Sequence, residues 1–115
     1  MLNEDDYKFV QESCVESQRL FNKLWRVADK VLHHQLVDEG LDDEDRETYE
    51  RHWLKLSTKV VDAISEKLEG YNIELLKNSS LEEPVIYLNF IKEDDVSRLK
   101  IEYRGENEIT LTQIS

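Results

Sequence analysis

The spacing of the apolar residues changes once along this chain, at Gly70, and that change limits the folds open to it. Before Gly70, apolar residues recur every three or four positions, which is the period of an amphipathic helix. After Gly70 they alternate with polar residues, as in a strand. The sequence therefore predicts an α+β fold. Its 115 residues favour a single domain, with a helical hairpin over 1–70 and an antiparallel sheet over 71–115.

Two long helices are expected in the first part. The first covers residues 3–39, with Asn3 as its N-cap, and the second runs from Asp42 or Asp43 to about Glu69. So short a connection forces the helices to lie antiparallel, with position i facing roughly position 82 minus i.

Glycine is expected to end both helices. Gly40 suits the left-handed position after a helix end, and Leu41 would then fold back onto Leu36 as in a Schellman motif. Gly70 is predicted to end the second helix in the same manner.

The apolar stripes of the helices predict the core. On the first helix the stripe is Tyr7, Val10, Cys14, Phe21, Leu24, Ala28, Val31 and Leu32. On the second it is Tyr49, Trp53, Leu56, Val60, Ile64 and Leu68. Trp25 also falls on an inward face, so both tryptophans are predicted to pack in the core.

The second part predicts three or four strands, at 71–76, 85–91, 98–104 and 108–114, joined by short turns into an antiparallel meander. Strand 98–104 alternates cleanly, with Leu99, Ile101 and Tyr103 inward. Strand 85–91 is apolar on both faces, although a strand covered on one side alternates. Its second face, with Val85, Tyr87 and Ile91, therefore needs a cover or a central place beneath a twist, and a dimer interface is one candidate cover.

Acidic residues are concentrated where the two helices meet. The chain holds 26 Asp and Glu against 15 Lys and Arg, a net charge of −11 that disfavours nucleic-acid and anionic-membrane partners. The candidate partner-binding acids are Asp38, Glu39, Asp42, Asp43, Glu44, Asp45 and Glu47. Helix capping accounts for Asp42 to Asp45, since carboxylates suit a helix N-terminus, but it does not account for Asp38 and Glu39 at the end of the first helix. The alternative is a solvated turn with no partner.

A row of basic residues follows helical spacing on the first helix: Arg19, Lys23, Arg26 and Lys30. With Arg51, Lys55 and Lys59 of the second helix it would form one band on the outer side of the helical layer. The alternative is the solvated face that amphipathic helices ordinarily have.

No catalytic, cofactor or metal motif is visible. His33 and His34 are adjacent, so on a helix they point about 100° apart and do not chelate one ion together. Cys14 lies on an apolar stripe, which predicts a buried thiol rather than a nucleophile. A lone cysteine, an acidic N-terminus without an apolar signal core, and no run of membrane-spanning length favour the cytoplasm.

These observations favour a small acidic, non-enzymatic binding protein that docks on a basic surface of a protein partner, as an inhibitor or immunity-type protein would. The alternative is a structural or assembly subunit that associates with itself. We also expect a homodimer, because the first helix outreaches the second and carries Tyr7, Phe9, Val10 and Cys14 on the overhanging turns. In a monomer, the sheet would cover that overhang instead.

Overall fold

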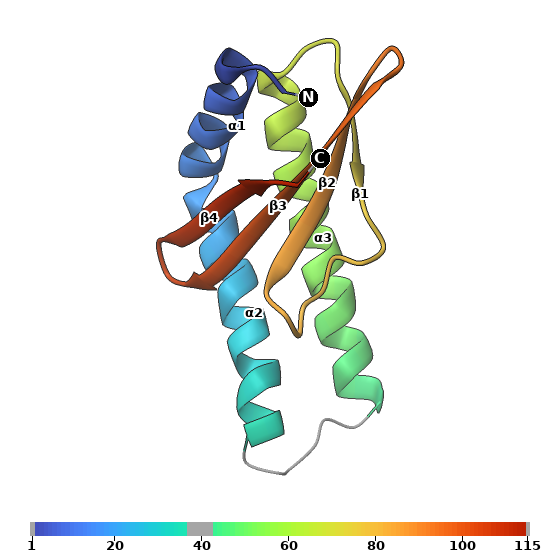
Figure 1. Cartoon of the computed structure of the whole chain (residues 1–115). Helices are drawn as coiled ribbons and strands as arrows, with labels where there is room; N and C mark the ends of the chain where they lie inside the picture. The colour runs from blue at the N-terminus through green and yellow to red at the C-terminus, as the bar shows by residue number, and fades with distance from the viewer. Residues whose placement is uncertain (1, 37–42, 115) are drawn as a thin grey trace.

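The computed structural model describes residues 2–36 and 43–114 and has the predicted α+β fold (Figure 1). The elements are α1 (Glu4–Glu16), α2 (Gln18–Leu36), α3 (Asp43–Lys67), β1 (Asn72–Leu75), β2 (Val85–Lys92), β3 (Asp95–Gly105) and β4 (Glu108–Gln113). Three predictions lie outside the described residues: the Gly40 terminator, the contact of Leu36 with Leu41, and the placement of Asp38, Glu39 and Asp42.

The prediction of one unbroken first helix is wrong at Ser17, where α1 ends and α2 begins. The N–H of Leu20 donates to the Ser17 carbonyl at 2.9 Å, a bond three residues long that tightens the turn. One turn earlier, the Ser13 hydroxyl donates to the Phe9 carbonyl at 2.8 Å. Serine hydroxyls that take up backbone carbonyls in this way bend helices. The apolar stripe keeps its phase from Cys14 to Phe21, although the polar Ser17 stands at the stripe position between them, so the period alone gave no sign of the bend.

The helices nevertheless pack as the predicted antiparallel hairpin. Lys67 of α3 forms an ion pair with Glu16 of α1 at 3.1 Å, and these positions add to 83, close to the predicted 82. Asn3 caps α1, since its side chain accepts a bond from the N–H of Asp6 at 2.8 Å. Gly70 has a φ of +88°, which confirms the left-handed residue predicted after the second helix.

The sheet is a four-stranded antiparallel meander in the order β1-β2-β3-β4. Leu88 of β2 lies opposite Leu99 of β3, and Ile86 lies opposite Ile101. All four residues are completely buried, because this face of the sheet packs on the helices. Leu99, Ile101 and Tyr103 therefore point inward as predicted, and Figure 1 shows the sheet lying across the helical layer.

In the described part of the chain, no helix lies over the second face of the sheet (Figure 1). Val85 on this face is buried, whereas Tyr87 and Ile91 are partly exposed. On α1, Val10 and Cys14 are fully buried inside the chain, as the monomer alternative requires, and Phe9 is 46% exposed. The core thus lies between the helical layer and one face of the sheet.

The molecule is elongated, with extents of 46 × 26 × 22 Å. The last turns of α2 and the first turns of α3 extend past the end of the sheet (Figure 1). The segment that joins β1 to β2 lies beside these turns, and surface recesses form between this segment and the helices.

Candidate functional site

The described acidic residues among those predicted to bind a partner sit at the end of the helical hairpin that extends past the sheet. Asp43 is the first residue of α3, and Glu44, Asp45 and Glu47 are exposed on its first turns. One turn further along, Glu50 reaches the lining of a surface groove. The described part of the acidic cluster therefore borders a recess.

The basic residues predicted on the first helix do not join this site. Arg19, Lys23, Arg26 and Lys30 are all exposed on α2. The guanidinium of Arg26 donates to Glu106 at 2.9 Å, and Asn22 accepts from the N–H of Asn107 at 2.9 Å. This flank of α2 thus contacts the tip of the β3–β4 hairpin, where Glu106 neutralises one cation of the row.

The segment Ser79–Pro84 forms one wall of the recess and is held by several hydrogen bonds. Ser80 and Val85 exchange backbone bonds of 3.0 and 3.1 Å. The Ser80 hydroxyl accepts from the N–H of Glu82 at 3.1 Å and of Glu83 at 3.3 Å, a local turn that serine favours. Leu81 is only 6% exposed, because the turn inserts it into the core. The Ser79 hydroxyl likewise accepts from the N–H of Tyr87 at 2.8 Å, so both serines hold the segment in place.

On one side of this segment lies a recess of about 390 Å³, which we call the apolar groove. Its lining consists of Val31, Arg46, Glu50, Trp53, Leu54, Ser79, Ser80, Leu81 and Glu82. Leu54 is 52% exposed, although its neighbours Trp53 and Leu81 are buried. The indole N–H of Trp53 donates to the Tyr103 hydroxyl in the core, which fixes the ring. Apolar side chains thus line the groove, and charged ones border it.

The groove also has a salt bridge across it. Arg46 of α3 lies 3.0 Å from a carboxylate oxygen of Glu82, and both side chains are nearly half exposed. Such an exposed pair contributes at most about 1 kcal/mol, so it opens at little cost. The remaining carboxylates near this end, including Glu47 and Glu50, leave the rim acidic.

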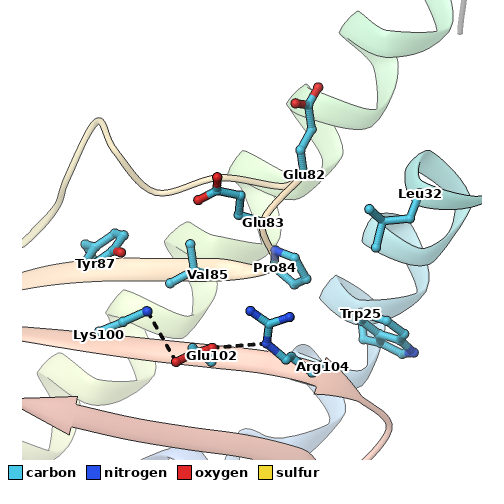
Figure 2. A pocket seen from close by; sticks show the side chains of 10 residues that line it. All are labelled: Trp25, Leu32, Glu82, Glu83, Pro84, Val85, Tyr87, Lys100, Glu102 and Arg104. Carbon is cyan, nitrogen blue, oxygen red and sulfur yellow. Dashed lines mark hydrogen bonds and ion pairs between the residues drawn. The ribbon is translucent and has the colours of Figure 1, made fainter. Parts of the chain in front are cut away.

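On the other side of the segment lies a second recess of about 490 Å³, which we call the sheet-face hollow (Figure 2). Trp25 and Leu32 of α2 line it together with Pro84, Val85 and Tyr87. Here Trp25 departs from its prediction, since it is partly exposed at the edge of the helical layer rather than packed fully in the core. Trp25 points inward from its helix but reaches only the margin of the sheet, which therefore covers part of its ring.

The charges of the sheet-face hollow largely neutralise one another. Glu102 accepts from Arg104 at 3.1 Å and lies 3.3 Å from the Lys100 amine, as the dashed lines of Figure 2 show. The hydrogen bond from Arg104, followed by that from Lys100, lowers the pKa of Glu102. The Lys100 amine also lies 6.0 Å from the centre of the Tyr87 ring. Because Glu102 already occupies both cations, this hollow does not present a concentrated positive charge.

Sequence reasoning missed Leu54, Leu81 and Glu82, which shape the apolar groove. Leu54 departs from the three-and-four spacing of its helix, so an apolar residue off the stripe was an available signal. Leu81 is the one large apolar residue in the polar stretch 77–84, and this isolation could have predicted that its side chain is buried. The contribution of Glu82 comes from loop geometry and had no signal in the sequence.

Comparison of the chain with protein-family models, with curated proteins and with solved structures found no match. In residues 2–36 and 43–114, no group of three His, Cys, Asp or Glu side chains is arranged to hold a metal ion. Among the helices described, none is long and apolar enough to cross a membrane.

Proposed function

We propose that this chain is a non-catalytic binding protein that docks a basic, apolar-anchored segment of a partner protein in the apolar groove. The observation that carries the proposal is Leu54, which is 52% exposed beside the buried Trp53 in a groove bordered by carboxylates. Protein-binding patches combine an apolar centre with a polar rim, and the apolar groove has both. An arginine or lysine of the partner would pair with the rim while its apolar side chain covers Leu54.

The charge of the whole chain supports a basic partner. Glu44, Asp45 and Glu47 are exposed at the same end as the groove, and the net charge is −11. Complementary charge around a binding site accelerates association with the right partner and repels acidic ones. An inhibitor or an immunity-type protein would work in this way, by covering a basic functional surface of its target.

The four described groups with shifted pKa values are not tuned for acid or base catalysis near neutral pH. Burial raises the pKa of Cys14 to about 12 and moves that of Tyr103 well above its usual range. The bond to Asp6 raises the pKa of Tyr71 to about 12, and Arg104 lowers that of Glu102. All four shifts lead away from neutrality, whereas a general acid or base works best with a pKa near the working pH.

We also propose a cytoplasmic location. Cys14 is the only cysteine of the chain and is 1% exposed, so it forms no internal disulfide and presents no reactive thiol at the surface. That arrangement fits a reducing compartment.

Affinity capture from a native lysate at low and high salt tests the proposal. Wild-type protein is compared with Leu54→Lys and with the matched control Val96→Lys. Val96 is 50% exposed at the start of β3, next to the β2–β3 turn, and does not line the groove. We expect Leu54→Lys to lose a protein that wild type and Val96→Lys both retain, and we expect high salt to weaken that capture. Identical retention by all three proteins would contradict a groove-centred interface.

The contribution of the acidic rim is tested separately. Glu47→Gln/Glu50→Gln removes two carboxylates near the groove, and Asp62→Asn/Glu66→Gln removes two exposed carboxylates further along α3. We expect only the first variant to slow association with the captured partner, because nearby charges act on the encounter. Equal slowing by both variants would show that net charge, rather than the rim, governs association.

A further inference from the structure

The strand β4 is an edge of the sheet with hydrogen-bonding groups directed outward. The N–H of Ile114 donates to the Arg98 carbonyl at 3.0 Å, and Leu99 lies opposite Gln113 in the register. Hydrogen-bonded and non-hydrogen-bonded pairs alternate along an antiparallel ladder. The backbone groups of Ile109, Leu111 and Gln113 therefore point away from β3.

This edge lacks the features that normally block strand addition. Residues 109–114 read ITLTQI, with no charge and no proline, in a chain of which 36% is charged. Exposed edges are usually protected by charges, prolines or shortness. The opposite edge, β1, is protected in this manner, because it has only four residues and includes Glu74. The β4 edge is thus the better template for another strand.

The β4 edge is partly capped by Tyr7, and one side-chain amide of the strand is unpaired in the part of the chain that the structure describes. The Tyr7 hydroxyl donates to the outward Leu111 carbonyl at 3.2 Å, which still leaves that oxygen a second lone pair. The Nε2 atom of Gln113 is buried and has no hydrogen-bond partner among the described residues. Buried polar groups are normally satisfied, so the unpaired amide is consistent with a missing neighbour.

We propose that the β4 edge pairs with the β4 edge of a second copy of this chain, antiparallel about a two-fold axis at Leu111. This register sets Leu111 opposite Leu111 and Ile109 opposite Gln113 of the second copy. In this register, each of Ile109, Leu111 and Gln113 lies opposite a residue of the second copy whose backbone groups also point outward. Shifting one strand along the other would leave at least one of these three residues without such a partner. On the open face, Thr110 lies opposite Thr112, a pairing that stabilises antiparallel strands.

The charges of this register are complementary, which favours a second copy as the occupant. Glu108, the one acidic residue of β4, comes opposite Ile114 of the second copy. Ile114 is bonded to Arg98, so Glu108 lies two strand spacings, about 10 Å, from that cation on the same face. Within one copy, Lys100 lies opposite Thr112 and Glu102 lies opposite Thr110. Because Thr110 of one copy pairs with Thr112 of the other, Lys100 of one copy and Glu102 of the other fall in the same row across the combined sheet. Two strongly acidic chains thus meet here without like charges opposite each other.

The proposal does not depend on partner binding in the apolar groove. Sedimentation equilibrium of the full chain, from low micromolar to near-millimolar concentration, measures dimerisation directly, and amide hydrogen exchange locates it. We expect a concentration-dependent dimer with protection of the Ile109, Leu111 and Gln113 amides and none at Ile73, whose amide points outward from the β1 edge. A monomer at every concentration, or a dimer without protection on β4, would overturn the proposal.

Two double variants at exposed positions test the register. In Thr110→Lys/Thr112→Lys, lysines of the two copies lie opposite each other, whereas in Thr110→Lys/Thr112→Glu each lysine meets a glutamate. We expect the first to dimerise about tenfold or more weakly than the second. Circular dichroism and urea unfolding confirm that both are folded. Equal dimerisation of the two folded variants would refute this register.

Discussion

The lone cysteine makes this protein sensitive to alkali in a way that can be calculated. Cys14 is 1% exposed on the inward face of α1, and burial raises the pKa of its thiol from 9.0 to about 12. The unfolded chain therefore loses this proton first as the pH rises. Between these two pKa values the folded state binds more protons, so the free energy of unfolding falls with increasing pH.

The size of the effect follows from the gap between the two pKa values. Each pH unit within that gap costs about 1.4 kcal/mol for one group. From pH 8 to about pH 10.5 the unfolded thiol ionises almost completely while the folded thiol does not, so Cys14 alone removes about 2 kcal/mol. That loss is a large part of the roughly 5–15 kcal/mol that stabilises an ordinary domain.

Urea unfolding of wild type and Cys14→Ala across this pH range isolates the contribution. The variant loses about 1 kcal/mol at neutral pH for the missing sulfur, and this cost does not depend on pH. We expect the stability gap to close and then reverse by about 2 kcal/mol in total as the pH approaches 10.5. The buried tyrosines affect both proteins alike and cancel. Parallel pH profiles for the two proteins would refute the assignment of Cys14 as a buried, neutral thiol.

Three other substitutions probe contacts on which the fold depends. Tyr103→Phe removes the acceptor of the buried Trp53 N–H, and urea unfolding should show a loss of about 1–3 kcal/mol, with no loss if that bond is unimportant. Gly70→Ala puts a side chain at a φ of +88° and should cost about 1 kcal/mol, whereas an unchanged midpoint would mean that the turn relaxes freely. Asp6→Asn should lower the pKa of Tyr71 from about 12 toward 10 in an ultraviolet titration, because the Asp6 carboxylate is the main cause of the shift, and an unmoved titration would contradict that cause.

The architecture was predictable because its signals are local and repeated. The change of period at Gly70 separated helices from strands, and alternation along β3 oriented Leu99, Ile101 and Tyr103 correctly. The bend at Ser17 was missed, because the bond from the Ser13 hydroxyl to the Phe9 carbonyl leaves the phase of the apolar residues unchanged. Periodicity reports which side of an element is buried but not whether its axis is straight.

The candidate site was only half predictable. The acidic end of the hairpin was readable from composition, because Glu44, Asp45 and Glu47 lie close together in the sequence. The apolar groove was not, since it forms where Leu54 of α3 meets Leu81 and Glu82 of a loop about thirty residues away. Trp25 illustrates the same limit, because its exposure depends on where the sheet ends rather than on its own helix. Recesses form where the helices, the sheet and the loops meet without filling the space between them. The spacing of residues within one helix or strand does not show where this happens.

The central claim is that the apolar groove is the docking surface. The most direct test is hydrogen exchange of the full chain alone and in complex with the partner that wild type captures and Leu54→Lys does not. Docking in the apolar groove predicts new protection in the segments that line it, around Val31, Trp53 to Leu54, and Ser79 to Glu82. Protection confined to the basic row of α2 or to the open face of the sheet, with the groove unchanged, would contradict it.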